Sequence, residues 1–317
     1  MGDPSSSGAL RRLTPHVHAW THPTGTWGWS NAGLVADRQD AVLVDTQFTV
    51  GMTRRLRDAV VSAVPGVRVS TVVNTHANGD HCWGNGLFPG AAVVASAGTA
   101  DEVAGEITPE VLRQVVAAAP PGGPLAAYLD RYFAPFDFAD ITVVPPTATF
   151  RGDTSVYAGG VEVRLLELGP AHTHGDTVAW VPEDGVLFAG DLLFVGDHPI
   201  AWSGPLDNWV RACDAMLATG ADTIVPGHGP VTTPAAVRTL RHHLEYVAEQ
   251  ARQRCAAGMD WRCAAADIPV PGYAAGWGNP ERIVFLVAAE YRSAGAPAPG
   301  DQASLLAAAA DLAAHRR

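Results

Sequence analysis

Short apolar runs separated by turn residues dominate the first half of the chain, and one amphipathic stretch interrupts them. The runs are rich in valine and alanine and have the length of strands, whereas Leu56, Val60 and Ala63 recur at helical spacing. We therefore predict strands at residues 17–20, 29–35, 41–44, 69–73 and 92–95, and a helix at residues 52–64.

The pattern changes over residues 99–138. A Thr-Pro-Glu sequence at residues 108–110 is typical of a helix start, and a Pro/Gly-rich segment at residues 120–124 ends that helix. A second helix is predicted at residues 125–133. We interpret residues 99–138 as a helical insertion that is either a lid or pocket wall over a site, or a surface excursion with no role in binding.

The second half returns to strands and then becomes helical. Strands are predicted at residues 141–144, 148–150, 154–157, 161–168, 178–180, 186–188 and 223–225, with a helix at residues 206–218. From residue 234, helices are predicted at residues 235–258, 281–293 and 304–315, around a segment rich in Pro, Gly and Trp at residues 261–279. Two mixed β/α halves indicate two sheets packed together with helices outside.

Length and composition permit a large core and exclude some partners. The chain has 317 residues, of which 47% are hydrophobic, enough for one large or two small domains. The net charge is −11 and the longest basic cluster is residues 54–57, so we expect no nucleic-acid partner. No apolar run is long enough to span a membrane, and residues 1–13, a predicted disordered tail, contain no apolar leader. We therefore expect a cytoplasmic protein without a membrane partner.

Ionisable residues gather where the predicted strands end. The strand at residues 69–73 leads into the sequence Asn-Thr-His-Ala-Asn-Gly-Asp-His at residues 74–81. Later strand-like runs end close to His172, Asp191 and His228. Histidine and carboxylate side chains brought to one place are how proteins hold zinc or iron, so this pattern predicts a metal site.

The arrangement resembles the metallo-β-lactamase superfamily, whose first motif is His-x-His-x-Asp-His. Here residues 76–81 read His-x-Asn-x-Asp-His, so Asn78 replaces the second histidine. The later motifs match at His172, Asp191 and His228, and several motifs in the right order are a far more specific signal than one.

The resemblance covers residues 20–231 and implies an α/β fold, a four-layered αββα sandwich. The corresponding domain spans residues 14–231 and contains the helical insertion at 99–138. Residues 232–317 are predicted to be a C-terminal helical extension packed on this core.

The resemblance also implies the metal ligands. The first metal position would take His76, His172 and the slot of Asn78, and Asp191 would bridge to the second. The second position would take Asp80, His81 and His228. We expect one or two zinc ions, with iron or manganese as alternatives, and a metal-bound hydroxide as the nucleophile.

Asn78 leaves the number of metals open, because an amide oxygen is a weaker zinc ligand than imidazole. One metal could work in the site of Asp80, His81, His228 and Asp191. Alternatively, the Asn78 oxygen or a water could complete the first position, or catalysis could be lost.

Several further residues lie near the motifs in the sequence. Asp80 and His198 are candidate catalytic residues, with His198 as a proton donor to the leaving group. Asp45, at the end of a predicted strand, is a candidate for orienting a histidine ligand. Candidate substrate-binding residues are Trp29, Trp83, His174 and Trp202.

Within the superfamily, the block at residues 74–88 is similar to cytoplasmic thioesterases and cyclases of bacterial aromatic polyketide pathways. That similarity implies hydrolysis of an acyl thioester, lactone or related carbonyl substrate, small or bound to a carrier protein. One alternative is a mononuclear iron oxidoreductase of the persulfide dioxygenase type, held by His76, His172 and Asp191. Another is a degenerate binding protein without turnover. Whether the chain forms a homodimer is left open by the sequence.

Overall fold

Two mixed β-sheets form the centre of the molecule. The computed structural model describes residues 8–23, 25–119 and 121–316. The first sheet contains, in spatial order, β1 (Ala9–Arg12), β2 (Val17–Thr21), β3 (Ala32–Asp37), β4 (Asp40–Val44), β5 (Arg68–Val73), β6 (Ala92–Ser96) and β7 (Ala148–Phe150). The second contains β12 (Thr223–His228), β11 (Val186–Phe194), β10 (Thr177–Val181), β9 (Val161–Glu167) and β8 (Thr154–Ala158).

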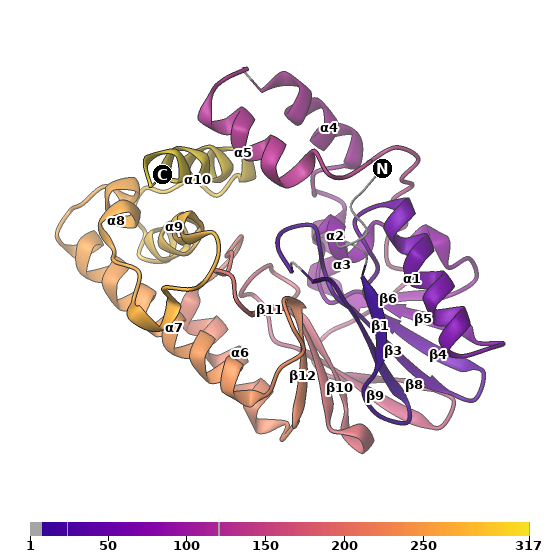
Figure 1. Ribbon diagram of the computed structural model, residues 1–317. Helices are drawn as coiled ribbons and strands as arrows, with labels where there is room; N and C mark the ends of the chain where they lie inside the picture. Colours follow the sequence, from indigo (N-terminus) through magenta and orange to yellow (C-terminus); the bar gives the residue numbers. More distant parts are fainter. Residues whose placement is uncertain (1–7, 24, 120, 317) are drawn as a thin grey trace.

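Strand direction differs within each sheet. Strands β1 to β4 pair antiparallel, whereas β4 to β7 pair parallel. In the second sheet only β11 and β12 pair parallel. The parallel strands β4, β5, β11 and β12 end at the same side of the molecule, where the motif residues follow them (Figure 1).

The sheets pack face to face through branched apolar side chains. Val35, Val44 and Val73 of the first sheet share one buried cluster with Leu165 and Val186 of the second. Helix α1 (Val50–Ala63) buries Leu56 and Val60 against the outer face of the first sheet, while α6 (Leu206–Ala218) and α7 (Pro234–Ala256) cover the second (Figure 1). The four-layered αββα sandwich expected from the sequence is therefore confirmed.

Helices from the insertion and from the C-terminal extension meet above the strand ends. The insertion contains α3 (Ala97–Val103), α4 (Pro109–Ala118) and α5 (Pro124–Phe133). The extension contains α7, α8 (Trp261–Asp267), α9 (Ile283–Ser293) and α10 (Gln302–His315). Helices α5 and α10 pack side by side although they are far apart in the sequence (Figure 1).

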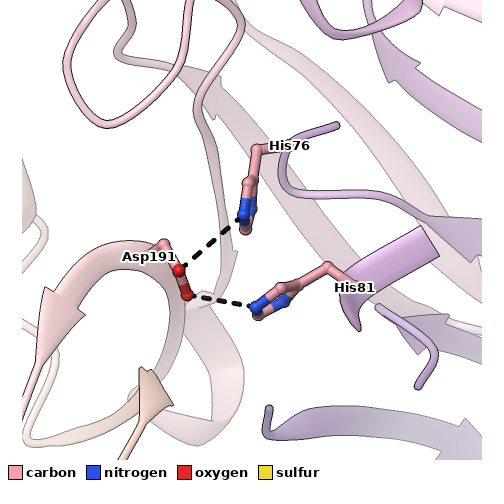
Figure 2. Close-up of side chains that lie close together, drawn as sticks. All are labelled: His76, His81 and Asp191. Carbon is pink, nitrogen blue, oxygen red and sulfur yellow. Dashed lines mark ion pairs between the residues drawn. The ribbon is translucent and has the colours of Figure 1, made fainter. Parts of the chain in front are cut away.

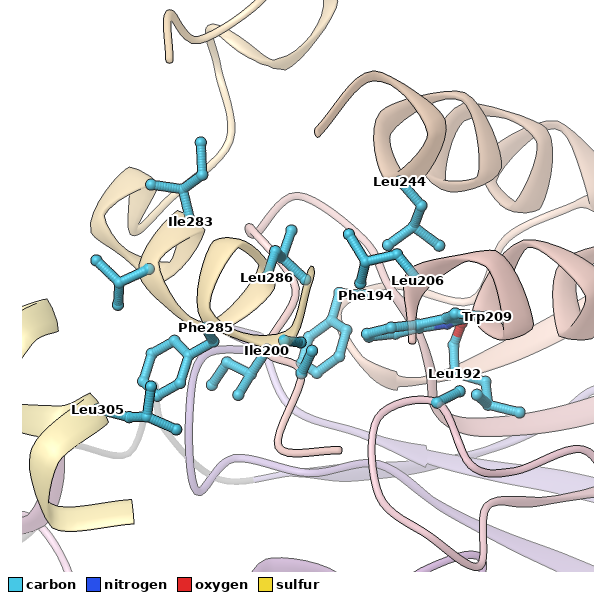
Figure 3. Close-up of a cluster of buried hydrophobic side chains, with 14 of the residues drawn as sticks. Leu192, Phe194, Ile200, Leu206, Trp209, Leu244, Ile283, Phe285, Leu286 and Leu305 are labelled. Carbon is cyan, nitrogen blue, oxygen red and sulfur yellow. The ribbon is translucent and has the colours of Figure 1, made fainter. Parts of the chain in front are cut away.

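The helix α9 joins this upper layer to the rest of the core. Its residues from Ile283 to Tyr291 are all buried. Phe285 and Leu286 lie between Leu305 of α10 and Phe194 at the end of β11 (Figure 3). The extension thus shares a continuous apolar cluster with the second sheet.

Two predictions of local structure are wrong. Residues 9–12 of the expected disordered tail form β1, because their backbone pairs with β2 from Ala9 opposite Thr21 onward; residues 1–7 lie outside the described residues. The strand predicted at 141–144 is absent. In addition, helix α8 lies within the segment rich in Pro, Gly and Trp, where no helix was predicted, and the side chain of Asp260 caps its first turn.

Among the described residues, no helix combines the length and the apolar character needed to cross a membrane.

Candidate metal centre

The first sheet delivers its ligands on the loop that follows β5. Asp45, just after β4, accepts hydrogen bonds from Thr75 N and Thr75 Oγ1, both at 2.8 Å. These bonds fix the backbone immediately before His76. The short helix α2 (Gly79–Cys82) then starts at the motif and carries Asp80 and His81.

The second sheet delivers the remaining ligands from β11, β12 and the loop before β10. The pairing of β11 with β12 is irregular around Gly190, which places Asp191 at the bend. Gly190 has a φ of 52°, and a Cβ there would come within 2.6 Å of Thr75 Oγ1. Glycine therefore allows the two sheets to approach each other beside the cluster.

Asp191 lies at the centre of the histidines. Its Oδ1 is 3.1 Å from His81 Nε2, and its Oδ2 is 3.9 Å from His76 Nε2 (Figure 2). Its Oδ2 also lies 3.4 Å from His172 Nε2 and 3.5 Å from His228 Nε2. This central position agrees with a bridging role for Asp191.

Asp80 and His228 form the other side of the cluster. His228 Nε2 lies 3.4 Å from Asp80 Oδ2 and 3.5 Å from His81 Nε2. One possible ligand atom each from Asp80, His81 and His228 lies within 4.8 Å of the others, and the same holds for His76, His81 and Asp191. The six residues expected to bind metal are thus brought together.

Neighbouring groups orient the histidine rings. His81 Nδ1 lies 2.9 Å from Asp45 Oδ2, and His172 Nδ1 donates to the Ile200 carbonyl at 2.6 Å. Each contact turns the Nε2 atom of the ring toward Asp191. A hydrogen bond at the far nitrogen is the usual way in which a protein fixes the tautomer of a metal-binding histidine.

The charges within the cluster shift its pKa values. Burial alone would lower the pKa of His81, but the carboxylates of Asp191, Asp45 and Asp80 raise it well above the ordinary value. Burial and the carboxylates compete in the same way at His228, where Asp191 and Asp80 raise the pKa to about 9. Burial alone would raise the pKa of Asp191, but His228 and His81 hold it well below its ordinary range. The carboxylates therefore remain anionic and attract cations.

His76 and His172 behave in the opposite way. Burial, followed by repulsion from His81, lowers the pKa of His76 well below the ordinary value. Burial also lowers the pKa of His172. Both rings are neutral near pH 7, which is the form that binds metal.

The donor set fits a metal. His76 Nε2 is buried and has no hydrogen-bond partner within the described part of the chain. A cavity of about 10 Å³ lies among the side chains of Asn78, Asp80, His172, Asp191 and His228, together with Trp27, Phe194, Ile200, Trp202 and Arg282. A buried imidazole nitrogen without a partner, within 4.8 Å of ligand atoms of His81 and Asp191, suits a metal ion. His76, His172 and Asp191 would hold one ion, and Asp80, His81, His228 and Asp191 a second.

Asn78 turns its oxygen toward this cavity. Asn78 Oδ1 lies 2.8 Å from His172 Nε2 and accepts a hydrogen bond from Trp202 Nε1 at 3.1 Å. Because His172 Nδ1 donates to Ile200, the Nε2 atom of the neutral ring carries a lone pair. Two acceptor atoms therefore converge, which is the arrangement of two ligands of one cation.

A second, apolar cavity adjoins the metal cluster. Its volume is about 60 Å³, and its apolar lining residues are Trp27, Phe48, Trp83, Ile107, Leu112, Phe133, Trp202 and Leu306. It shares Trp27, Asn78, Asp80 and Trp202 with the smaller cavity. Leu112 of α4 and Phe133 of α5 belong to its wall, so two helices of the insertion line this cavity.

The four predicted substrate-binding residues lie in different places. Trp83 and Trp202 line the apolar cavity, whereas Trp29 lines a larger groove of about 600 Å³ near Arg54 and packs on Phe136. His174 is exposed, with Nδ1 3.1 Å from Ser203 Oγ, and it lines neither cavity at the cluster. Proximity in sequence to His172 did not bring it to the site.

His198 differs most from its expected role. Its ring is buried against His243 and Trp277, with centroids 5.2 Å and 5.4 Å away. Burial, followed by the neighbouring His243, lowers the pKa of His198 to about 3, so the ring is neutral and a poor proton donor. It lines neither cavity at the cluster, because the chain after β11 turns toward Gly278 of the extension.

Sequence reasoning missed Arg282 and Glu106. Arg282 lines the small cavity and is 1% exposed, and Glu106 lines the apolar one. The signal for Arg282 was a charged pair, Glu281 and Arg282, directly before the wholly apolar start of a helix. A charge in that position is buried only when the fold gives it partners.

An αββα sandwich with histidines and aspartates converging between the strand ends defines a class of metal-dependent enzymes. The sequence profile of the metallo-beta-lactamase superfamily matches residues 25–228, and the chain belongs to this superfamily. Its known members include metal-dependent hydrolases, and the cluster fits metal binding without identifying the metal.

Two relatives and one solved structure illustrate the range of similarity. The 2,4-dinitroanisole O-demethylase subunit alpha of Nocardioides sp. (strain JS1661) is 26% identical over 189 residues, which are 59% of this chain and 48% of that one. The metallo-beta-lactamase type 2 of Bacteroides fragilis is 22% identical over 232 residues, covering 70% of this chain and 79% of that one. The sec-alkylsulfatase Pisa1 from Pseudomonas sp. has a TM-score of 0.69 at 16% identity, covering 90% of this chain and 50% of that one. The chain thus spans about half the length of the demethylase subunit and of the sulfatase.

Proposed function

We propose that this protein is a metal-dependent hydrolase that cleaves an ester, thioester or lactone bond in a substrate with a compact apolar body. The observation that carries the proposal is the junction of the two cavities. Trp27, Asn78, Asp80 and Trp202 belong to both, so an apolar group held in the larger cavity places the adjoining polar bond at the metal cluster. A pocket that joins an apolar wall to a few convergent polar groups is typical of a small-molecule site.

The roles of the side chains follow from their positions. A divalent ion held by these residues would polarise the scissile bond and would make a water molecule more acidic. The Asp80 carboxylate is buried, lies in both cavities and is fixed by Gly28 N at 3.2 Å, so it is placed to take a proton from the attacking water. Trp27 and Trp202 exclude bulk water from the scissile bond.

Cavity size restricts the substrate. At about 60 Å³ the apolar cavity is much smaller than the ~300 Å³ at which pockets for drug-sized ligands begin. Short acyl or alkyl groups fit such a space. A fused-ring polyketide on a carrier protein would require α4 and α5 to move outward, so we favour compact substrates within the thioesterase proposal.

A mononuclear iron oxidoreductase is the second candidate, since His76 and His172 both point toward Asp191. However, Asp80, His81 and His228 also converge, and an enzyme using only the first set would leave them without a metal role. We therefore rank hydrolysis first.

The test is a substrate panel on protein loaded with zinc or, separately, with iron(II). Short p-nitrophenyl esters, short acyl thioesters and an alkyl sulfate report hydrolysis, and an oxygen electrode with a thiol substrate reports oxidation. We expect ester or thioester turnover that falls at least 100-fold in Asp80→Asn and is unchanged in Asp130→Asn, an exposed aspartate on α5. Oxygen consumption without hydrolysis would establish the iron enzyme instead, and no turnover of any probe would reject catalysis on these substrate classes.

A further inference from the structure

Arg282 is a buried cation held rigidly beside the metal cluster. It ends the short helix η5 (Pro280–Arg282), immediately before α9, and is 1% exposed. Its Nη1 donates to Asp197 Oδ2 at 2.8 Å and to the His198 carbonyl at 3.2 Å. Asn279 Nδ2 donates to both oxygens of Asp197, at 2.7 Å and 2.8 Å, so the anchoring carboxylate is itself fixed.

Aromatic rings complete the support of the guanidinium. The Arg282 Cζ atom lies 5.6 Å from the Trp27 ring centroid and 5.9 Å from that of Tyr132. Stacking against rings leaves the edge of a guanidinium free to make hydrogen bonds. Trp27 also lines both cavities, so it connects the arginine to the apolar pocket.

Two donors of this arginine are not used by the protein. Within the described residues, Arg282 Nε and Arg282 Nη2 are buried and have no hydrogen-bond partner. Leaving a buried charged donor unpaired costs free energy, so these two N–H groups are available to a bound water, ion or ligand. Arg282 lines the same small cavity as Asp80, His172, Asp191 and His228.

We propose that Arg282 forms an oxyanion-binding site next to the metal cluster, and that the substrate carries a carboxylate, sulfate or phosphate oxygen close to its scissile bond. An arginine edge with two free N–H groups matches the geometry of such an anion. The inference rests on the proposed function and narrows its substrate class: a compact apolar group for the pocket, joined to an anionic head for Arg282. Asp197 supplies the countercharge that keeps the guanidinium in place before the substrate binds.

Anion binding to the zinc-loaded protein tests this site directly. Calorimetric titrations with inorganic sulfate, inorganic phosphate and acetate would compare the wild type with Arg282→Lys and Arg282→Gln. We expect binding of at least one anion to weaken at least tenfold in Arg282→Gln. The loss should be smaller in Arg282→Lys, which keeps the positive charge but lacks the two parallel N–H groups of the guanidinium. Comparison of sulfate and phosphate, which are tetrahedral, with the planar carboxylate of acetate shows which kind of anionic group the site prefers.

The matched control is Arg131→Gln. Arg131 is exposed, donates to Asn279 Oδ1 at 3.3 Å and stacks on Tyr132, but lines neither cavity. Its replacement should leave anion affinity unchanged, whereas an equal loss in both variants would point to a general charge effect and overturn the site. Because every variant is loaded with zinc, anion contacts to the metal are common to all.

A measurement on the wild type covers the case in which the Arg282 variants unfold. The Nε–H resonance of Arg282 should shift as sulfate, phosphate or acetate is added, because one of the free donors gains a partner. An anion affinity independent of Arg282, or a resonance that does not move, overturns the inference whatever the hydrolysis assays show. Conversely, Arg282-dependent anion binding without turnover would leave the anion site standing and reject the proposed hydrolysis.

Discussion

The amide of Asn78 stands where the superfamily motif has a histidine, and its surroundings compensate in part for the change. Trp202 donates a hydrogen bond to Asn78 Oδ1, which directs the oxygen and not the amide nitrogen toward His172. An amide oxygen oriented in this way is a usable ligand, although a weaker one than imidazole for zinc. The affinity of the first position for a metal ion therefore depends on Asn78 and Trp202 together.

Replacing Asn78 with histidine should tighten the first metal position. We expect Asn78→His to raise the zinc affinity of the weaker site at least tenfold, because imidazole replaces an amide oxygen. Trp202→Phe should have the opposite effect, since it removes the N–H that orients the oxygen. Competition with a chromophoric chelator measures both, and equal affinities in all three proteins would show that Asn78 is not a ligand.

The residues that the sequence marks as candidate metal ligands come together in the fold, because they lie in, at the end of or shortly after buried strands. Asp191 and His228 stand at the ends of apolar runs, and the fold brings such strand ends together. His198 lies away from both cavities at the cluster, although it is close to Asp191 in sequence, because the chain turns toward the extension after β11. The sequence marks Arg282 as a charge next to an apolar helix but does not place it at the cluster, because its position depends on contacts with Asp197 and Trp27 that are remote in sequence.

At the scale of elements, the contact between Glu106 and Gln302 ties the insertion to the C-terminal extension. Gln302, the first residue of α10, donates from Nε2 to both Glu106 oxygens, at 3.2 Å and 3.1 Å. Both residues line the apolar cavity. The wall of the pocket therefore depends on two segments that meet only in the folded protein.

The burial of Glu106 should make stability depend on pH. Burial raises the pKa of Glu106 from its ordinary 4.5 to about 7, so the folded protein holds the proton more tightly than the unfolded chain. The stability contributed by the protonated form is complete below pH 4.5 and is lost as pH rises through about 7. Glu106→Gln should remove that loss, so the melting temperature of the variant should exceed that of the wild type more at pH 8 than at pH 6.

The matched control is Glu110→Gln. Glu110 is an exposed residue on α4 that forms an ion pair with Arg113. Its melting temperature relative to the wild type should vary little over the same pH range, since an exposed pair contributes little. A difference between Glu106→Gln and the wild type that does not change with pH would contradict the assignment of this group.

Elements with branched apolar runs or clear helical spacing were predictable, whereas elements that depend on tertiary partners were not. Ile141 and Val143 alternate as in a strand, but they are partly buried against the main cluster without a neighbouring strand. Alternation reports which side chains are buried, and here packing under the insertion produces it. Strand β1 has few apolar residues, and it forms because its backbone pairs with the edge of β2.

For the whole molecule, the metal cluster is a junction between its two halves. His76, Asp80 and His81 come from the first sheet and its following loop, while His172, Asp191 and His228 come from the second. The buried cluster between the sheets is apolar and its contacts lack direction, and a few hydrogen bonds, such as that from Thr177 N to the Thr75 carbonyl at 2.8 Å, supplement it. An ion held by ligands from both sides would therefore link the sheets at their strand ends.

Metal binding should consequently raise the thermal stability of the whole protein. Zinc at a thousandfold excess over its dissociation constant contributes about 4 kcal/mol, because it binds the folded state alone. That corresponds to a rise of roughly 6 °C in melting temperature for a chain of this size, and removal of zinc by a chelator should reverse it. The rise should grow as pH increases toward 9, because zinc must displace the proton that Asp191 and Asp80 hold on His228, whose pKa is about 9.

His172→Gln should lose much of the rise in melting temperature, while His174→Gln, two residues away and exposed, should keep it. Equal shifts in these two variants would mean that zinc stabilises the protein from somewhere other than the junction of the sheets.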